Sequence, residues 1–145
     1  MNSSEIKIYT DGACLGNPGR GGWGAVLLYK EHCKEISGNE AHSTNNRMEL
    51  KAVIEGLRTL KKLSEATVYT DSKYVMDGST KWMFNWKKNG WKGADKKPIK
   101  NIDLWQELDA ELAKHKIKWV WVKGHSGNKY NEIVDTLARN AAEKA

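Results

Sequence analysis

Four acidic residues of this chain occupy positions from which their carboxylates could do chemistry. Asp11 and Asp71 each close a segment with strand-like alternation, and Glu49 and Asp135 lie beside the apolar faces of helix-like segments. A desolvated carboxylate on an apolar face is costly unless something pairs with it. No lysine or arginine shares the apolar stripe of Glu49, so the sequence predicts a different kind of partner for this acid.

Divalent cations are the partner that would suit all four acids at once. If Asp11 and Asp71 end neighbouring strands and both helices pack over that edge, the four carboxylates could converge. The negative carboxylates of such a cluster repel one another, and some of them take up protons unless cations neutralise the charge. Mg²⁺ prefers oxygen ligands, and two ions about 4 Å apart can clamp the attacking and leaving oxygens of a phosphodiester. The chemistry indicated is hydrolysis of a phosphate backbone.

Each of the four acids also has an ordinary structural interpretation. Aspartates at strand ends often occupy turns or cap a following helix, and helical acids often pair with a nearby base. The alternatives are a turn at Asp11-Gly12, a cap by Asp71 of a helix starting at Ser72, a pair of Glu49 with Arg47 or Lys51, and a pair of Asp135 with Arg139. Periodicity and spacing alone leave these alternatives open.

The elements that must position the acids follow from periodicity and turn residues. Alternation predicts strands over residues 5–12, 21–30, 31–40, 66–72 and 117–122. Helical spacing predicts helices over 45–63 with Ser43, Thr44 or Asn45 as N-cap, over 73–88 with a break near Gly78, over 101–115 and over 131–145. Three strands joined by short turns, followed by strands that alternate with helices, predict an α/β fold: a five-stranded mixed sheet, its first three strands antiparallel, with helices on both faces.

The excess positive charge is confined to one segment. Residues 81–100 hold seven lysines and one aspartate, which accounts for the whole net charge of +6, and they also hold Trp82, Trp86 and Trp91. Basic side chains interleaved with aromatic ones suit contacts to phosphates and packing on sugars or bases. The same pattern also fits a solvated helical face whose tryptophans anchor it to the core.

Composition excludes several other classes of protein. A chain of 145 residues suits one domain, and it has no apolar run near the ~20 residues of a membrane span and no leader of the secretory type. Its two cysteines, Cys14 and Cys33, lack the spacing of a zinc site or a disulfide framework. We therefore expect a soluble, cytoplasmic protein with reduced thiols.

Four segments of the chain, in order, closely resemble type 1 ribonuclease H of the bacterial kind. They are "YTDGACLGNPGRGGWGAVL", "TNNRMELKAVIEGL", "YTDSKYV" and "WVKGHSGNKYNEIVDTLA". The resemblance implies a ribonuclease H-like fold over residues 1–145 as a single domain, with a basic handle at about 81–101 and without an N-terminal hybrid-binding domain. It implies an endonuclease that cuts the RNA strand of RNA–DNA hybrids and leaves 5′-phosphate and 3′-hydroxyl ends. Nothing in the sequence demands more than a monomer, and we expect no membrane attachment and no obligate protein partner.

The same resemblance assigns the catalytic residues. Asp11, Glu49, Asp71 and Asp135 match the family's four metal-binding acids, with two Mg²⁺ ions when hybrid is bound and Mn²⁺ as a substitute. Asp11 would be the acid most shared between the ions. His125 matches a histidine that assists proton transfer and product departure.

Substrate contacts are implied for each strand of the hybrid. For the RNA strand they are Asn17, Asn45 and Asn46 in the minor groove, with Glu49 accepting from a 2′-hydroxyl. For the DNA strand they are Trp82 and Trp86 in an aromatic channel, Thr44 and Asn101 in a phosphate pocket, and Lys87 and Lys88 on the handle. Two positions depart from the family pattern: His42 replaces an arginine near the phosphate pocket, and Lys73 replaces a glutamine, trading a base contact for a phosphate contact.

Two rival interpretations remain. A proofreading exonuclease on a similar fold carries a second acid two residues after the first, where this chain has Ala13, so that interpretation is disfavoured. A hybrid-binding module without catalysis belongs to a different class, and the presence of all four acids argues against it. Cutting of a hybrid, as opposed to binding alone, separates the two classes.

Overall fold

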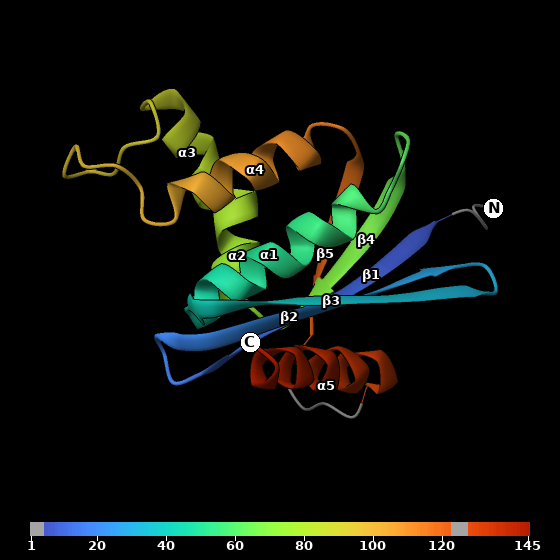
Figure 1. Ribbon diagram of the computed structural model, residues 1–145. Coiled ribbons are helices and arrows are strands. Elements are labelled where there is room, and N and C mark those ends of the chain that lie inside the picture. Colours follow the sequence, from blue (N-terminus) through green and yellow to red (C-terminus); the bar gives the residue numbers. More distant parts are fainter. Residues whose placement is uncertain (1–4, 123–127) are drawn as a thin grey trace.

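A computed structural model describes residues 5–122 and 128–145 of the chain, and its centre is a twisted sheet (Figure 1). The strand order within the described residues is β3-β2-β1-β4-β5. The strands are β1 (Ile6–Leu15), β2 (Gly19–Tyr29), β3 (His32–Ser43), β4 (Glu65–Thr70) and β5 (Lys116–Trp121). β1, β2 and β3 pair antiparallel, whereas β1–β4 and β4–β5 pair parallel. The predicted five-stranded mixed sheet is therefore confirmed.

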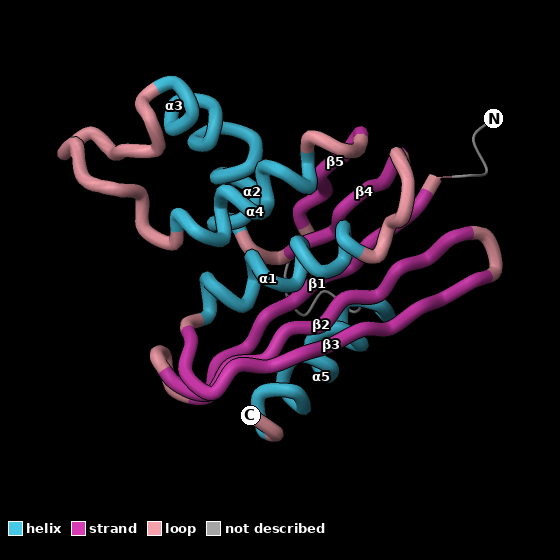
Figure 2. The backbone as a smooth tube through the Cα atoms, turned by 45° about the horizontal axis from the view of Figure 1, so that its top comes forward, coloured by secondary structure: helices cyan, strands magenta, loops and turns pink. Residues whose placement is uncertain are grey.

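Helices cover both faces of this sheet, also as predicted. In Figure 1, α5 (Lys129–Glu143) lies below the sheet, and α1 (Asn45–Arg58) and α4 (Ile102–Leu112) lie above it with α2 (Lys73–Asp77) and α3 (Met83–Lys88). The larger core lies between the sheet and helices α1 and α4 and includes Ile8, Val53 and Trp105. A smaller core lies between the sheet and α5. Figure 2 shows β2 and β3 as a long ribbon that forms one edge of the sheet. No helix in the described ranges is long and apolar enough to cross a bilayer.

The predicted end of the first strand at Asp11 was wrong. β1 continues to Leu15 because β2 still supplies hydrogen-bonding partners there, and Asp11 itself lies opposite Gly24. The parallel pairing of β1 with β4 ends earlier, at Tyr9 and Tyr69. Asp11 thus lies inside β1, just beyond the point where β4 stops pairing with it. The turn interpretation of Asp11 is excluded by the same geometry.

Two helix predictions were also wrong in detail. α1 ends at Arg58, not near residue 63, and Leu63 lies in the following loop, where the residue is 75% exposed. The helical winding does not break at Gly78 either, because a π-helical segment, η1 (Gly78–Trp82), joins α2 to α3. Gly78 packs directly against the ring of Trp105, where a Cβ atom would clash. This glycine serves close packing between helices and does not end a helix.

Candidate active site

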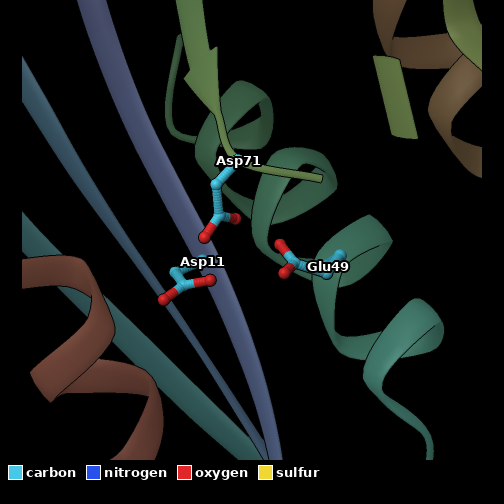
Figure 3. A group of neighbouring side chains, drawn as sticks. All are labelled: Asp11, Glu49 and Asp71. Atoms are coloured by element: carbon cyan, nitrogen blue, oxygen red, sulfur yellow. The ribbon is translucent and has the colours of Figure 1, made fainter. Parts of the chain in front are cut away.

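Three of the four predicted acids converge in space. Asp11 comes from β1, Glu49 from α1, and Asp71 from the residue that directly follows β4. Each contributes one carboxylate oxygen to a group in which all the oxygens lie within 4.8 Å of one another. Figure 3 shows the three side chains directed toward one shared space between the strand and the helix. We call these three residues the carboxylate triad.

Close packing of α1 on β1 brings Glu49 to this space. Gly12 follows Asp11, and a Cβ atom at Gly12 would lie 2.5 Å from the backbone nitrogen of Glu49. Only a residue without a side chain allows this approach. The start of α1 is fixed by Thr44, whose side chain accepts a hydrogen bond from the backbone N–H of Arg47.

The end of β4 fixes Asp71 in a similar way. The backbone N–H of Ser72 donates to the Thr70 hydroxyl at 3.0 Å, and the Ser72 hydroxyl accepts from the N–H of Val75 at 3.2 Å. Ser72 is therefore the N-cap of α2. The alternative in which Asp71 caps this helix does not hold, because Ser72 is the N-cap and the Asp71 carboxylate faces Asp11 and Glu49.

The basic residues proposed as alternative partners of Glu49 are engaged elsewhere. Arg47 donates to Asp103 at 2.7 Å, and Lys51 lies 3.5 Å from Glu55. The Oε1 atom of Glu49 is buried without a hydrogen-bond partner among the described residues. A buried carboxylate oxygen left in this state is costly, so the geometry leaves room for a ligand that accepts its lone pairs.

The pKa values of the triad also indicate a site that lacks a balancing positive charge. Burial, followed by the negative charge of Asp71, raises the pKa of Asp11 from 3.8 to about 8. Burial and the charges of Asp11 and Asp71 likewise raise the pKa of Glu49 well above its usual range. Crowded carboxylates hold protons in this way when no cation balances their charge. Three hard oxygen donors in one polar cleft therefore fit a divalent ion such as Mg²⁺.

Asp135 lies at the rim of the site and not within the triad. It lines the same cleft, which has a volume of about 290 Å³, and its charge contributes to the raised pKa of Asp11. Its carboxylate, however, pairs with Arg139 at 3.0 Å, one turn further along α5. The ion pair of Asp135 with Arg139, the structural alternative for this acid, is therefore present, and Asp135 also borders the cleft.

Four residues of the cleft were not predicted from the sequence as site residues: Gly12, Ser72, Asn131 and Glu132. Besides the four acids, its lining comprises Gly12, Asn45, Asn46, Ser72, Asn131 and Glu132. Asn131 is buried, whereas Glu132 is exposed. Both precede Asp135 by about one helical turn, so helical spacing from that acid could have identified them.

The residues implied to contact RNA lie together at the start of α1. Asn45 and Asn46 line the cleft, and the side-chain oxygen of Asn17 accepts a hydrogen bond from the N–H of Asn45 at 3.2 Å. The implied phosphate pocket lies next to them. Arg47 links its two members, because its N–H donates to Thr44 and its guanidinium donates to Asn101, in each case at 3.2 Å.

The tryptophans of the handle differ in how far they are exposed. Trp82 is 39% exposed, and its ring centroid lies 6.0 Å from that of Trp86. Trp86 and Trp91 also pack against the main core, as the anchoring interpretation required. Trp82 thus keeps more than a third of its surface exposed to solvent.

The predicted lysines differ in their surroundings. Lys87 pairs with Asp109 on α4 at 3.1 Å, and Lys88 lies over the exposed ring of Phe84. Lys73 lies over the ring of Trp121. His125 lies outside the described residues.

Fold and site together define an α/β domain with a carboxylate cluster suited to hard cations. The RNase H family model matches residues 3–143. The chain is 56% identical to Ribonuclease H of Marinobacter nauticus, covering 98% of this chain and 97% of that protein, and 58% identical to Ribonuclease HI of Haemophilus influenzae, covering 96% and 90%. It is similar to the crystal structure of LC9-RNase H1, with 34% identity and a TM-score of 0.88 over 97% of this chain and 73% of that one.

This chain belongs to the RNase H family, and it is an enzyme of the ribonuclease H type. The resemblance that the sequence motifs carried is thereby confirmed, together with the fold that it implied.

Proposed function

We propose that this protein is an endonuclease that hydrolyses the RNA strand of RNA–DNA hybrids, leaving 5′-phosphate and 3′-hydroxyl ends. The observation that carries the proposal is the convergence of Asp11, Glu49 and Asp71, within 4.8 Å, in a chain of the RNase H family. A cleft lined by several acids does not suit a phosphate backbone on its own, because both are negatively charged. It suits one when divalent ions lie between them.

The triad and Asp135 would hold those ions. We propose Mg²⁺, two ions with hybrid bound, and Mn²⁺ as a substitute, since carboxylate oxygens are the donors these ions prefer. When bound, the ions would stabilise the attacking and leaving oxygens of the phosphodiester. Asp11 would be the acid most shared between the ions, since the charges of both Asp71 and Asp135 act on it. Asp135 would join after its carboxylate leaves Arg139.

The asparagines at the start of α1 would identify the RNA strand. Asn45 and Asn46 line the cleft beside Glu49, and Asn17 is joined to Asn45 by a hydrogen bond. Amide groups can donate to and accept from a 2′-hydroxyl, and a carboxylate can accept from it. Deoxyribose lacks this group, so DNA in the cleft would leave these polar groups without their partners.

The DNA strand would lie toward the handle. Thr44 and Asn101 would bind a phosphate, Trp82 and Trp86 would pack on deoxyribose, and Lys73, Lys87 and Lys88 would contact backbone phosphates. His125 would assist proton transfer and product departure, a role supported by the family resemblance alone. We further propose that residues 1–145 act as one domain with a basic handle at 81–101, as a monomer in the cytoplasm.

The test is a cleavage assay with three labelled substrates, an RNA–DNA hybrid, duplex DNA and duplex RNA, each with Mg²⁺ and with EDTA. We expect cutting of the hybrid's RNA strand only, and only with Mg²⁺. Asp11→Asn serves as the matched control. It replaces one carboxylate oxygen of the triad by an amide NH₂ group and removes its negative charge, so it should not cut the hybrid. Cutting of duplex DNA would contradict the substrate assignment, and binding of the hybrid without cutting would favour the non-catalytic module.

A further inference from the structure

Trp121, the last residue of β5, presents an exposed aromatic ring beside the candidate active site. It is 43% exposed, although tryptophan is the largest apolar side chain. Its partner in the sheet is Thr70, the residue before Asp71. The N–H of Val122 donates to the Thr70 carbonyl at 2.8 Å, so β5 is held to β4 up to the point where the triad begins. The backbone that carries this ring is therefore firmly placed.

The ring lies on the same side of the sheet as the triad residue Glu49. Side chains alternate along a strand, so Trp121 and Trp119 point to one face and Val120 to the other. Trp119 packs against the core under α1, which fixes the face for both tryptophans. α1 is also the helix that supplies Glu49.

Lys73 covers the ring of Trp121. Its ammonium lies 4.8 Å from the ring centroid, within the range of a cation–π contact. Lys73 is the first residue of α2 and lies two positions after Asp71. The result is a flat apolar surface with a positive charge above it, directly next to the cleft. A sugar–phosphate backbone has the matching chemistry, because its sugars pack on apolar surfaces and its phosphates pair with ammonium groups.

We propose that Trp121 is a substrate-contacting residue that, with Lys73, supports the strand being cut where that strand leaves the cleft. This inference rests on the proposed function. The lining of the cleft includes Asn45, Asn46 and Ser72, and Lys73 follows Ser72 directly. A strand that runs from the asparagines across the triad toward Ser72 would meet this pair next, and the handle tryptophans would contact the other strand. Trp121 would pack on a ribose, and Lys73 would pair with the neighbouring phosphate.

The experiment measures hybrid binding in an Asp11→Asn background with Mg²⁺, so that cutting does not interfere. Trp121→Leu and Trp121→Phe are compared, since both fill the space with an apolar side chain and only phenylalanine keeps a flat ring. We expect the leucine variant to bind hybrid roughly 3- to 10-fold more weakly and the phenylalanine variant to stay within about 2-fold of its parent. Val120→Ala, one residue away on the opposite face, is the control and should bind like the parent.

Cleavage by otherwise unmodified protein supplies a second readout. Trp121→Leu should raise KM by a similar factor while kcat at saturating hybrid stays unchanged, a split that a merely structural role would not produce. Equal binding by the leucine and phenylalanine variants, or a loss shared with Val120→Ala, would overturn the role of Trp121. If the unmodified protein neither binds nor cuts hybrid, the proposed function itself fails, so the two failures are distinguishable.

Discussion

Helix α1 carries two glutamates whose surroundings are opposite in character. Glu55 has cations beside it, with Arg58 at 3.0 Å and Lys51 at 3.5 Å. Glu49, less than two turns earlier, faces the sheet and has two aspartates beside it. The same residue type on one helix is thus part of an ion-pair network in one place and of an uncompensated acidic cluster in the other.

The pKa values express this difference directly. The guanidinium of Arg47 lowers the pKa of Asp103 in the α1–α4 contact, whereas burial and neighbouring acids raise the pKa of Asp11 to about 8. An acid whose pKa is lowered stabilises the fold in its charged form. An acid whose pKa is raised is strained in its charged form, and sites of this kind are concentrated where a protein binds ions or performs chemistry.

The largest effect that would sharpen this contrast is expected for Asp11→Asn. Removing one charge from the triad should abolish cleavage of the hybrid while leaving the fold intact. In EDTA at pH 8 the variant should melt higher by on the order of 5 °C, because it relieves repulsion among clustered acids. Activity assays and thermal melts measure the two effects.

Glu107→Gln is the matched control, since Glu107 pairs with Arg58 at 2.8 Å in the ion-pair network. It should retain cleavage and leave the melting temperature unchanged or slightly lower. A large drop in melting temperature for Asp11→Asn would mean that the triad stabilises the fold, contrary to our account.

The second expected effect is a fall in stability with rising pH when divalent ions are removed. Asp11 has a pKa of about 8 in the folded protein against 3.8 in a free chain, so between these values the folded state holds a proton that the unfolded state has released. The stability that this proton contributes is fully present below pH 3.8 and is lost as pH rises through about 8. Urea unfolding in EDTA at pH 5 to 9 should show this slope. An equal slope in Asp11→Asn would assign it to other groups.

A smaller effect is expected from the lysines of the basic handle. Replacing Lys87 and Lys88 by alanine should weaken hybrid binding and reduce the slope of log affinity against log salt by about 1 to 2, with little change in rate at saturating hybrid. Lys61→Ala with Lys62→Ala, two lysines beyond the far end of α1, is the charge-matched control. Identical salt slopes for both double variants would show that the handle does not touch the backbone.

The smallest effect concerns the fourth acid. Arg139→Gln should release the Asp135 carboxylate and tighten Mg²⁺ binding by about 2- to 5-fold, the range expected from an exposed ion pair. Titration calorimetry without nucleic acid measures this directly. Arg20→Gln is the control, since Arg20 donates to a backbone carbonyl of Glu143 and to no acid of the site. Weaker binding in Arg139→Gln would mean that Arg139 helps to place Asp135.

Sequence reasoning identified the unusual acids but not how they meet. The position of Glu49 on an apolar stripe, without a base, was visible from helical spacing and required a partner of another kind. The close approach of α1 to β1 was not visible, because it depends on Gly12 touching a backbone 37 positions away in sequence. The extension of β1 past Asp11 was equally hidden, since it depends on which neighbouring strand continues to pair.

The pairing of charged residues was the least predictable part. Arg47 was a candidate partner of Glu49 as a near neighbour in the sequence, yet it bonds Asp103, which lies 56 positions away. The pair of Asp135 with Arg139 was predictable, because it forms within one turn of a helix. Local pairs follow from spacing, whereas contacts between helices depend on the packing of the whole fold.

The most direct test of our central claim is the melting temperature at pH 8 as Mg²⁺ is titrated, for unmodified protein and for Asp11→Asn. A ligand that binds the folded state stabilises it in proportion to the logarithm of its concentration above the dissociation constant. We predict that Mg²⁺ raises the melting temperature of the unmodified protein and leaves that of Asp11→Asn nearly constant. The same rise in both proteins, or no rise in either, would contradict the claim that the carboxylate triad is a site for divalent ions.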